Sequence, residues 1–422
     1  MATIFFEETA MATIWRGLSR VVLALAMATA AGAATGEVEY KVPALADFSG
    51  PFADVSKHLV ARDAVIKWWN DNDGKKLGIK LTVKNYDTRY DGTVVASMWP
   101  GILAEMKPII GLGLGGADLS ALQQRLPNDK VPLIYAPPGY GFGWLPNQWV
   151  FNARATYVHE WVTALAWYAG QNPQKRPLKV AFLSTQSSPA FVDIVKGMDK
   201  YIKTVLEPKG IATVVVTEWI DMQPVDLSSQ MKKIIDAKAD VITGTANTTM
   251  AAAALRAMQL HGVNIPTIAA PWHTIWPLAQ AMKSYAPWEG HMVVTGIASS
   301  TEKESKAWQF YQVLAKGYGL PAEWNPLNLL GISQGLLAVR AVEHAARKVG
   351  ADKLTGTAVY EALTSSAFTE DELMGILPAM KYSKEAPFPL QNGKVRVEWV
   401  KNGKYQLATP NWLTIPSDVT KW

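Results

Sequence analysis

Short apolar or β-branched runs alternate with helical patterns along this chain, and no other feature constrains its fold as strongly. In the first part, the expected strands are Val38–Ala46, Ile79–Tyr86, Pro108–Ile110 and Val131–Ala136, and the expected helices are His58–Asn70, Thr93–Met106 and Asp118–Leu126. Such a βαβ series requires a parallel sheet with right-handed crossovers. The sequence therefore predicts a first α/β lobe.

The same alternation restarts after Phe151–Ala155. The expected strands are then Lys179–Ser184, Thr213–Trp219, Val241–Thr243, Thr267–Ala270 and His291–Gly296, and the expected helices are Tyr157–Tyr168, Ala190–Leu206, Leu227–Ala237 and Met250–His261. Long helical stretches follow at Glu304–Tyr318 and Leu329–Val349. Asn402-Gly403 predicts a hairpin that joins Lys394–Val400 to Lys404–Leu407. We therefore expect a second α/β lobe of comparable size.

The N-terminus has the pattern of a secretory signal peptide. Arg16 and Arg20 precede the apolar run Val21–Met27, and small residues ending in Ala31-Gly32-Ala33 follow it. The apolar run is shorter than the roughly 20 residues that a membrane span needs. The chain has no cysteine, which excludes disulfides and a lipid-modified cysteine. We expect residues 1–33 to be cleaved and the protein to reach a bacterial periplasm without lipid or a direct membrane anchor.

The charge and the polar motifs argue against several classes of function. The net charge of +5 arises from 41 basic and 36 acidic residues that are scattered along the chain, which disfavours nucleic-acid binding. The six histidines show no metal-ligand spacing, and the Gly-x-Ser-x-Gly motif of hydrolases is absent. We therefore expect no metal, no cofactor, no catalytic residues and no enzymatic activity.

A glycine-rich run, Gly111, Gly113 and Gly116, matches the GxGxxG spacing of dinucleotide-binding folds. That fingerprint also requires an acidic residue at the end of the next strand, where this chain has Ala136-Pro137-Pro138. Two interpretations remain. Backbone N–H groups at the start of a helix can bind a small ligand such as a carboxylate, or the glycines can simply let a strand and a helix pack closely.

Four stretches then occur in a recognisable order. They are Ala44–Ala53 with Ser49-Gly50-Pro51, Ile109–Leu122 followed by Val131–Ala136, Lys179–Ser184 with Asp226–Ile234, and Ala239–Gly244 with Leu255–Gly262. Together they resemble the type I periplasmic solute-binding proteins of ABC transporters, of the branched-chain amino-acid-binding class. The resemblance extends over nearly all of residues 37–422.

This resemblance implies an α/β fold of two Rossmann-like lobes with parallel sheets, joined by three crossovers. Lobe 1 would comprise residues 34–152 plus about 297–370, and lobe 2 residues 153–296 plus about 371–422. A small organic ligand would bind between the lobes of a monomer, and a membrane permease would recognise the closed form. A sensory receptor with the same fold is the alternative.

The resemblance also implies which loops contact the ligand. In the first lobe the matching positions are Phe52, Gly115, Gly116, Ala117, Pro138, Gly139 and Tyr140, and in the second they are Phe191, Ala246, Asn247, Trp272 and His273. The stretch Tyr140–Trp144 separates aromatic residues with glycines, so its rings either line a cleft or pack on one another.

The ligand class follows from a missing acid. Amino-acid binders of this family usually have a carboxylate at the position of Trp272 or His273, and Ala269–Pro277 contains no Asp or Glu. An ammonium group buried without a partner is costly. Asp118 is better placed to cap its own helix. We therefore expect an aromatic or other hydrophobic carboxylate, ahead of a branched-chain amino acid and of an amide.

Overall fold

The computed structural model describes residues 37–144, 147–271, 275–386 and 388–422. The expected signal peptide, Trp272 and His273 lie outside these ranges. Glu39–Trp422 forms one compact unit. None of the helices in the described ranges combines the length and the apolar character that a membrane crossing needs.

The first sheet has five strands in the order β2-β1-β3-β4-β5. They are β1 (Val38–Ala46), β2 (Ile79–Asp87), β3 (Gly111–Gly113), β4 (Leu133–Tyr135) and β5 (Val150–Asn152). β1, β3, β4 and β5 pair in parallel. The strand that the sequence predicted at Pro108–Ile110 instead begins at the next residue, Gly111. The residues that pair with β4 are Gly111, Leu112 and Gly113, and the two glycines leave room for the side chains of Leu133 and Tyr135.

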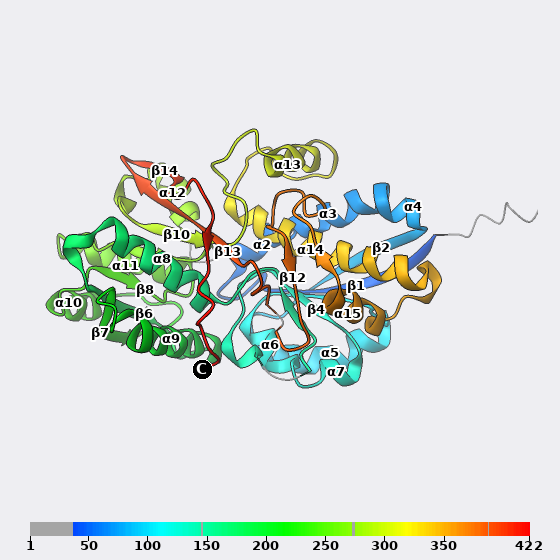
Figure 1. Ribbon diagram of the computed structural model, residues 1–422, viewed down its shortest axis with the longest axis horizontal. Coiled ribbons are helices and arrows are strands. Elements are labelled where there is room, and N and C mark those ends of the chain that lie inside the picture. Colours follow the sequence, from blue (N-terminus) through cyan, green and yellow to red (C-terminus); the bar gives the residue numbers. More distant parts are fainter. Residues whose placement is uncertain (1–36, 145–146, 272–274, 387) are drawn as a thin grey trace, which may run out of the picture. The chain divides into compact units, whose positions relative to one another are not determined.

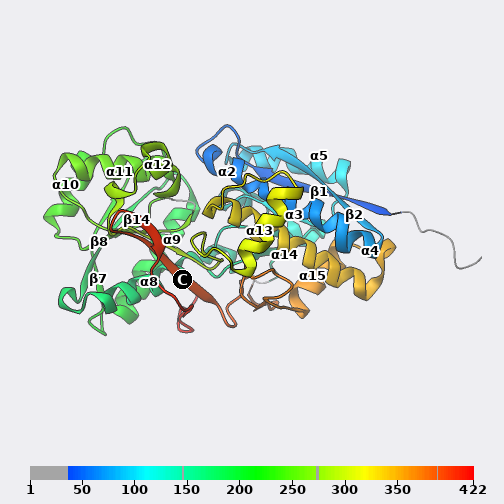
Figure 2. The ribbon, with the colours of Figure 1, turned by 90° about the horizontal axis from the view of Figure 1, so that it is seen from above.

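Helices from two separate parts of the chain pack around the first sheet, directly or on one another. Those before β5 are α2 (Ala53–Leu59), α3 (Ala61–Trp69), the π-helix η1 (Asn70–Gly74), α4 (Lys75–Leu77), α5 (Gly92–Met106), α6 (Gly116–Leu122), α7 (Leu126–Asp129) and the short η2 (Gly141–Gly143). Those from later in the chain are α13 (Lys306–Gly317), α14 (Pro326–Val349), η7 (Ala351–Lys353) and α15 (Gly356–Ser365). Figures 1 and 2 both show α14 beside α3, and α14 also contacts α2, β4 and α15.

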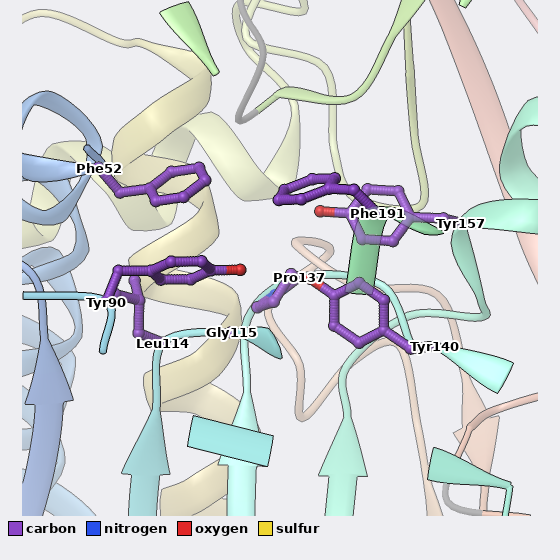
Figure 3. Close-up of a pocket in the computed structure, with 8 residues that line it drawn as sticks. All are labelled: Phe52, Tyr90, Leu114, Gly115, Pro137, Tyr140, Tyr157 and Phe191. Atoms are coloured by element: carbon purple, nitrogen blue, oxygen red, sulfur yellow. The ribbon is translucent and has the colours of Figure 1, made fainter. Parts of the chain in front are cut away.

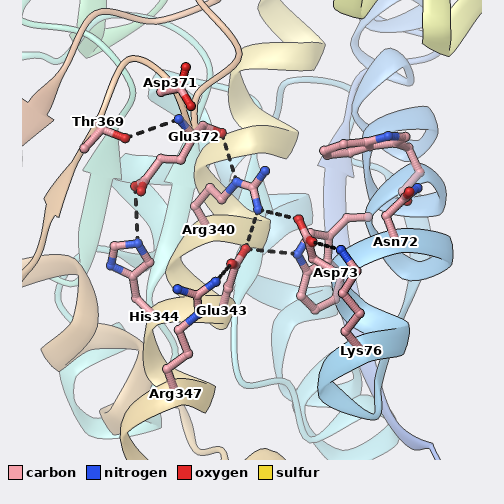
Figure 4. Close-up of polar contacts among 12 residues, drawn as sticks. Asn72, Asp73, Lys76, Arg340, Glu343, His344, Arg347, Thr369, Asp371 and Glu372 are labelled. Atoms are coloured by element: carbon pink, nitrogen blue, oxygen red, sulfur yellow. Dashed lines mark hydrogen bonds and ion pairs between the residues drawn. The ribbon is translucent and has the colours of Figure 1, made fainter.

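A polar cluster fixes α14 to the N-terminal helices (Figure 4). Arg340 on α14 donates through Nη1 to Asp73 Oδ2 at 2.9 Å and pairs with Glu343 one turn along. Its Nε donates to the carbonyl of Glu372 at 2.9 Å, and His344 Nε2 lies 3.2 Å from Glu372 Oε1. The cluster joins η1, α14 and the segment after α15, so that segment packs with the first sheet's helices.

The second sheet has the order β14-β13-β10-β9-β8-β6-β7, with β15 also paired to β13. Its strands are β6 (Leu178–Ser184), β7 (Ala212–Trp219), β8 (Val241–Thr243), β9 (Thr267–Ala269), β10 (Met292–Thr295), β13 (Lys394–Lys401), β14 (Lys404–Leu407) and β15 (Leu413–Thr414). β7 to β10 and β6 are parallel, whereas β13 pairs antiparallel with β10 (Val293 opposite Glu398). In Figure 1 the red β13 accordingly lies beside β10.

The helical elements of this second part alternate with its strands as expected. They are α8 (Tyr157–Gln171), η3 (Pro173–Lys175), α9 (Pro189–Tyr201), the π-helix η4 (Ile202–Leu206), α10 (Ser228–Asp236), α11 (Thr248–Leu260), α12 (Ile275–Met282) and η6 (Ala286–Trp288). The predicted hairpin at the end of the chain is also present, since β13 and β14 pair antiparallel across Asn402-Gly403. The predicted class, two α/β lobes with parallel-rich sheets, is confirmed.

The chain passes between the sheets after β5, after β10 and before β13. The small hairpin of β11 (Ala367–Phe368) and β12 (Met380–Lys381) contacts α15, and Tyr382 donates its hydroxyl to the carbonyl of Asn152 at 2.6 Å. We therefore propose that the third crossover follows Tyr382, rather than lying near residue 371.

Candidate functional site

Eight residues from the carboxyl ends of the strands surround a small pocket (Figure 3). They are Phe52, Tyr90, Leu114, Gly115, Pro137, Tyr140, Tyr157 and Phe191. The cavity that these side chains leave between them measures about 20 Å³. Ligand pockets in proteins typically measure about 300–1,000 Å³, so an organic ligand would enter this pocket only if the surrounding side chains or lobes moved apart.

The lining residues lie in the loops that connect strands to helices, or in the first turns of the helices that follow. Tyr90 lies after β2, Leu114 and Gly115 join β3 to α6, and Pro137 follows β4. Phe52 immediately precedes α2, Tyr140 precedes η2, Tyr157 begins α8, and Phe191 lies in the first turn of α9. In an open parallel sheet the carboxyl ends of the strands share one edge, where ligands bind. The pocket therefore combines the edges of the two sheets.

Aromatic rings form most of the wall. The rings of Phe52 and Tyr90 lie 4.4 Å apart between centroids. Phe52 and Phe191 are nearly parallel, with centroids 6.5 Å apart and planes at 12°. The hydroxyl groups of Tyr90 and Tyr157 point toward the space between the rings (Figure 3). The pocket thus has an apolar body and a few hydroxyl groups that can orient a polar head.

The lining is neutral. Among the described residues, no Asp, Glu, Lys, Arg or His lines the pocket. Burial, together with the nearby Asp118 carboxyl, raises the pKa of Tyr90, and burial also raises the pKa of Tyr140 and Tyr157 above the usual tyrosine value. All three phenols therefore keep their protons at physiological pH and remain hydrogen-bond donors.

Asp118 lies fully buried in the first turn of α6. Its Oδ2 accepts the backbone N–H of Leu114 at 2.6 Å and of Gly115 at 3.3 Å. Burial raises the pKa of this carboxyl to about 7, against the lowering effect of those two hydrogen bonds and of Arg62. Asp118 thus shapes the Leu114-Gly115 turn, in agreement with the capping role expected from the sequence, and it is not part of the pocket wall.

The structure explains the glycine-rich run by packing. A Cβ at Gly111 would lie 2.6 Å from Cδ1 of Leu133, and one at Gly113 would lie 2.5 Å from the ring of Tyr135. A Cβ at Gly116 would overlap the Cβ of Ala190 on α9. Close packing therefore accounts for all three glycines of the motif, and the glycine that lines the pocket is the intervening Gly115.

Four of the residues expected to contact a ligand come together in the pocket: Phe52, Gly115, Tyr140 and Phe191. Ala117, Pro138, Gly139 and Ala246 are buried outside its lining. Asn247 is also buried, and its side chain accepts the N–H of Met250 at 2.9 Å and donates to the carbonyl of Met222 at 2.9 Å. Asn247 therefore caps α11 in this structure.

Four lining residues were not expected from the sequence: Tyr90, Leu114, Pro137 and Tyr157. Leu114 and Pro137 adjoin expected positions. Tyr90 closely follows a strand that was expected to end at Tyr86, so an inspection of every strand end would have found it. Tyr157 begins a helix rather than following a strand, and only the chain's passage to the second sheet brings it to the pocket.

The acidic and histidine side chains give no sign of a metal centre. Within the described ranges, no three of His, Asp and Glu lie close enough together to hold a metal ion.

Comparison with known proteins places this geometry in a family. No curated protein sequence matches significantly. Among solved structures, an ABC transporter substrate-binding protein of Aeropyrum pernix superposes with a TM-score of 0.76 at 18% identity, over 90% of this chain and 97% of that one. A Thermus thermophilus branched-chain amino acid ABC transporter protein with bound valine gives a TM-score of 0.76 at 17% identity, over 91% and 98%.

A third similar structure is an R. palustris ABC transporter solute-binding protein in complex with benzoate, with a TM-score of 0.70, 16% identity and coverage of 91% and 100%. At these identities the structures establish the fold. The sequence itself matches the model of the family described as "Periplasmic binding protein" over residues 39–385, which is most of the chain. With two parallel-rich sheets and a pocket at their joined edges, this chain belongs to the periplasmic binding protein family, whose members are solute receptors and not enzymes.

Proposed function

We propose that this ABC transporter solute-binding protein captures a small aromatic or hydrophobic carboxylate in the periplasm and delivers it to a membrane permease. The observation that supports this ligand most directly is the pocket lining: five aromatic rings, three with neutral hydroxyl groups, and no charged side chain among the described residues.

The lining favours a carboxylate over an α-amino acid. Both carry a carboxylate, but an amino acid also brings an ammonium group, which needs an anionic or strongly accepting partner when it is buried. The nearby acid, Asp118, does not line the pocket, and its Oδ2 accepts the N–H groups of Leu114 and Gly115. Tyr140 and Tyr157 hydrogen-bond each other in this structure, and Tyr90 bonds to Ser188. A carboxylate that enters the pocket would compete for these phenol donors, and hydrogen bonds from them would stabilise its charge.

The aromatic walls favour an apolar ligand body. A flat ring that packs against Phe52 and Phe191 would bury apolar surface, and burying aromatic surface is a large source of affinity. The fold accommodates such ligands, since the similar R. palustris protein was solved with benzoate. The valine bound to the Thermus thermophilus protein makes branched-chain amino acids the alternative class to test.

Binding would be coupled to closure of the two lobes. α6 and α9 meet where Gly116 faces Ala190, next to the aromatic pair of Phe52 and Phe191. A ligand that touches both sides of the pocket stabilises the closed arrangement and shifts the population toward it. The permease would then recognise the closed protein.

A thermal-shift screen tests the ligand class. Benzoate and related aromatic acids should stabilise the purified protein, since a ligand at about 100 times its dissociation constant adds about 2.7 kcal/mol to the free energy of unfolding. Leucine, valine and simple amides should add less at equal concentration. Stabilisation by leucine or valine without any by aromatic acids would reject the proposed class.

Deletion of the gene should also abolish uptake of the ligand, whereas a lost response with normal uptake would indicate a sensory receptor.

Phe191→Ala should weaken benzoate binding by roughly 10- to 100-fold, because loss of a buried aromatic wall removes about 1.5–3 kcal/mol of apolar contact. Isothermal titration calorimetry measures this change. Phe48→Ala is the matched control, since Phe48 lies on the loop before α2 but is 41% exposed and outside the lining. Equal affinities of both variants would show that the ligand binds elsewhere.

A further inference from the structure

The last residues of the sequence lie along α9, on the second part of the chain. Tyr201 donates its hydroxyl to Asp418 Oδ1 at 2.7 Å, and Lys200 Nζ donates to the carbonyl of Lys421 at 2.8 Å. Trp422 then reaches Gly197, one turn earlier on α9. Residues 418–422 therefore run back along α9 toward its N-terminus, which is the end that carries Phe191 into the pocket.

The indole of Trp422 fills a space that two glycines leave open. A Cβ at Gly197 would lie 2.5 Å from Cε2 of Trp422, and a Cβ at Gly141 would overlap the same ring. The ring also meets Trp144 edge to face, with centroids 6.1 Å apart. The indole is thus packed between α9 and the turn η2.

That turn is joined to the pocket. The N–H of Gly141 donates to Asp193 Oδ2 on α9 at 2.6 Å, which ties the start of η2 to the same helix. Tyr140, directly before it, stacks on Phe142 with centroids 5.3 Å apart and planes at 6°, and Tyr140 lines the pocket. Phe388 supports the other side of the turn through Trp144, at 5.6 Å between centroids.

We propose that Trp422 is a positioning residue for the ligand pocket: by filling the gap between Gly141 and Gly197 it holds η2 against α9, and so fixes the ring of Tyr140 in the pocket wall. The indole acts through Tyr140 and is not part of the lining. The effect on ligand affinity rests on the proposed function, whereas the effect on the turn does not.

The test compares Trp422→Ala with the unsubstituted protein by hydrogen exchange and by benzoate titration. Without ligand, the amides of residues 140–144 should exchange about tenfold faster in the variant, because the turn opens more often. The dissociation constant for benzoate should rise about tenfold. Trp422→Phe should bring both the exchange rate of residues 140–144 and the dissociation constant for benzoate most of the way back to normal, since a phenyl ring fills part of the same gap.

Trp412→Ala is the matched control. It removes another partly exposed tryptophan from the same C-terminal region, whose ring lies over Arg396 at 4.4 Å. The control should leave the exchange of residues 140–144 and the benzoate affinity unchanged.

Two results would overturn the proposal. Exchange of residues 140–144 at the normal rate in Trp422→Ala would show that the indole does not hold the turn. Faster exchange with unchanged affinity for benzoate would show that the turn does not control the position of Tyr140 in the pocket wall. If the unmodified protein does not bind benzoate, the ligand proposal fails by itself, and the same titration is then made with valine.

Discussion

Gly116→Val should weaken ligand binding strongly while both lobes remain folded. Gly116 begins α6, and the position of its missing Cβ overlaps the Cβ of Ala190 in the first turn of α9. A branched side chain there would force the two helix ends apart. It would thereby separate Phe52 from Phe191, which come from the two sides of the pocket.

The expected loss of affinity for benzoate is about 10- to 100-fold, which corresponds to about 1.4–2.7 kcal/mol. Overpacking by extra methyl groups costs about 1–3 kcal/mol in a well-packed site, so the closed arrangement becomes unfavourable by a similar amount. Calorimetry measures the affinity. Small-angle scattering with saturating ligand should show that the variant fails to become more compact.

Gly101→Val provides the control. Gly101 is exposed on α5, and a Cβ there would meet nothing within 4 Å. This variant gains a little helix propensity, because valine is a better helix former than glycine, and it should keep the normal affinity and the normal compaction. Unimpaired binding by Gly116→Val would mean that the contact between α6 and α9 is not needed for the bound state.

Local patterns were sufficient for most of the fold. The strands Val38–Ala46 and Val241–Thr243 have the bounds that their apolar runs predict, and the Asn402-Gly403 turn gives the final hairpin. The three-residue strand Val150–Asn152 was missed because so short a run has no periodicity to detect. Its place in the sheet depends on pairing with β4, which is a tertiary contact.

The site was predictable only in part, for the same reason. Strand-end loops and the family resemblance indicated Phe52, Gly115 and Tyr140, because the position of a loop in a parallel sheet follows from the order of its strands. Asn247 occupies such a loop too, but its amide caps a helix, and a sequence does not show which partner an amide selects. Trp422 could not be placed at all, since its contacts with Gly141 and Gly197 join distant parts of the chain.

Removal of Arg154 should cause the largest loss of stability. Arg154 lies between β5 and α8, and Glu160 lies in the first turn of α8; both side chains are fully buried, with Nε and Oε1 3.6 Å apart. Arg154 Nη1 also donates to Thr295 Oγ1 on β10 at 3.0 Å. The pair thus joins two of the places where the chain passes between the sheets, and both ions are shielded from water.

At pH 8, where the carboxyl of Glu160 is largely ionised beside Arg154, Arg154→Met should lower the free energy of unfolding by about 3–5 kcal/mol, because the substitution leaves that carboxyl buried without its cation. The double variant Arg154→Met/Glu160→Leu should lose much less, since it buries no charge. Urea denaturation of the two single variants and the double variant gives the coupling energy. Lys232→Met, which breaks an exposed pair with Asp236, should change stability by no more than about 1 kcal/mol.

The loss should also depend on pH. Burial raises the pKa of Glu160 from 4.5 to about 7, and the charge of Arg154 opposes that rise, so the pKa should be higher still in Arg154→Met. A carboxyl group whose pKa is raised in the folded state favours folding when it is protonated. That contribution is lost as the pH rises from the group's pKa in the unfolded state through its pKa in the folded state. The deficit of Arg154→Met should therefore be smaller at pH 5 than at pH 8. A deficit that is equal at both values, or a double variant as unstable as the sum of the single ones, would show that the two charges do not stabilise each other.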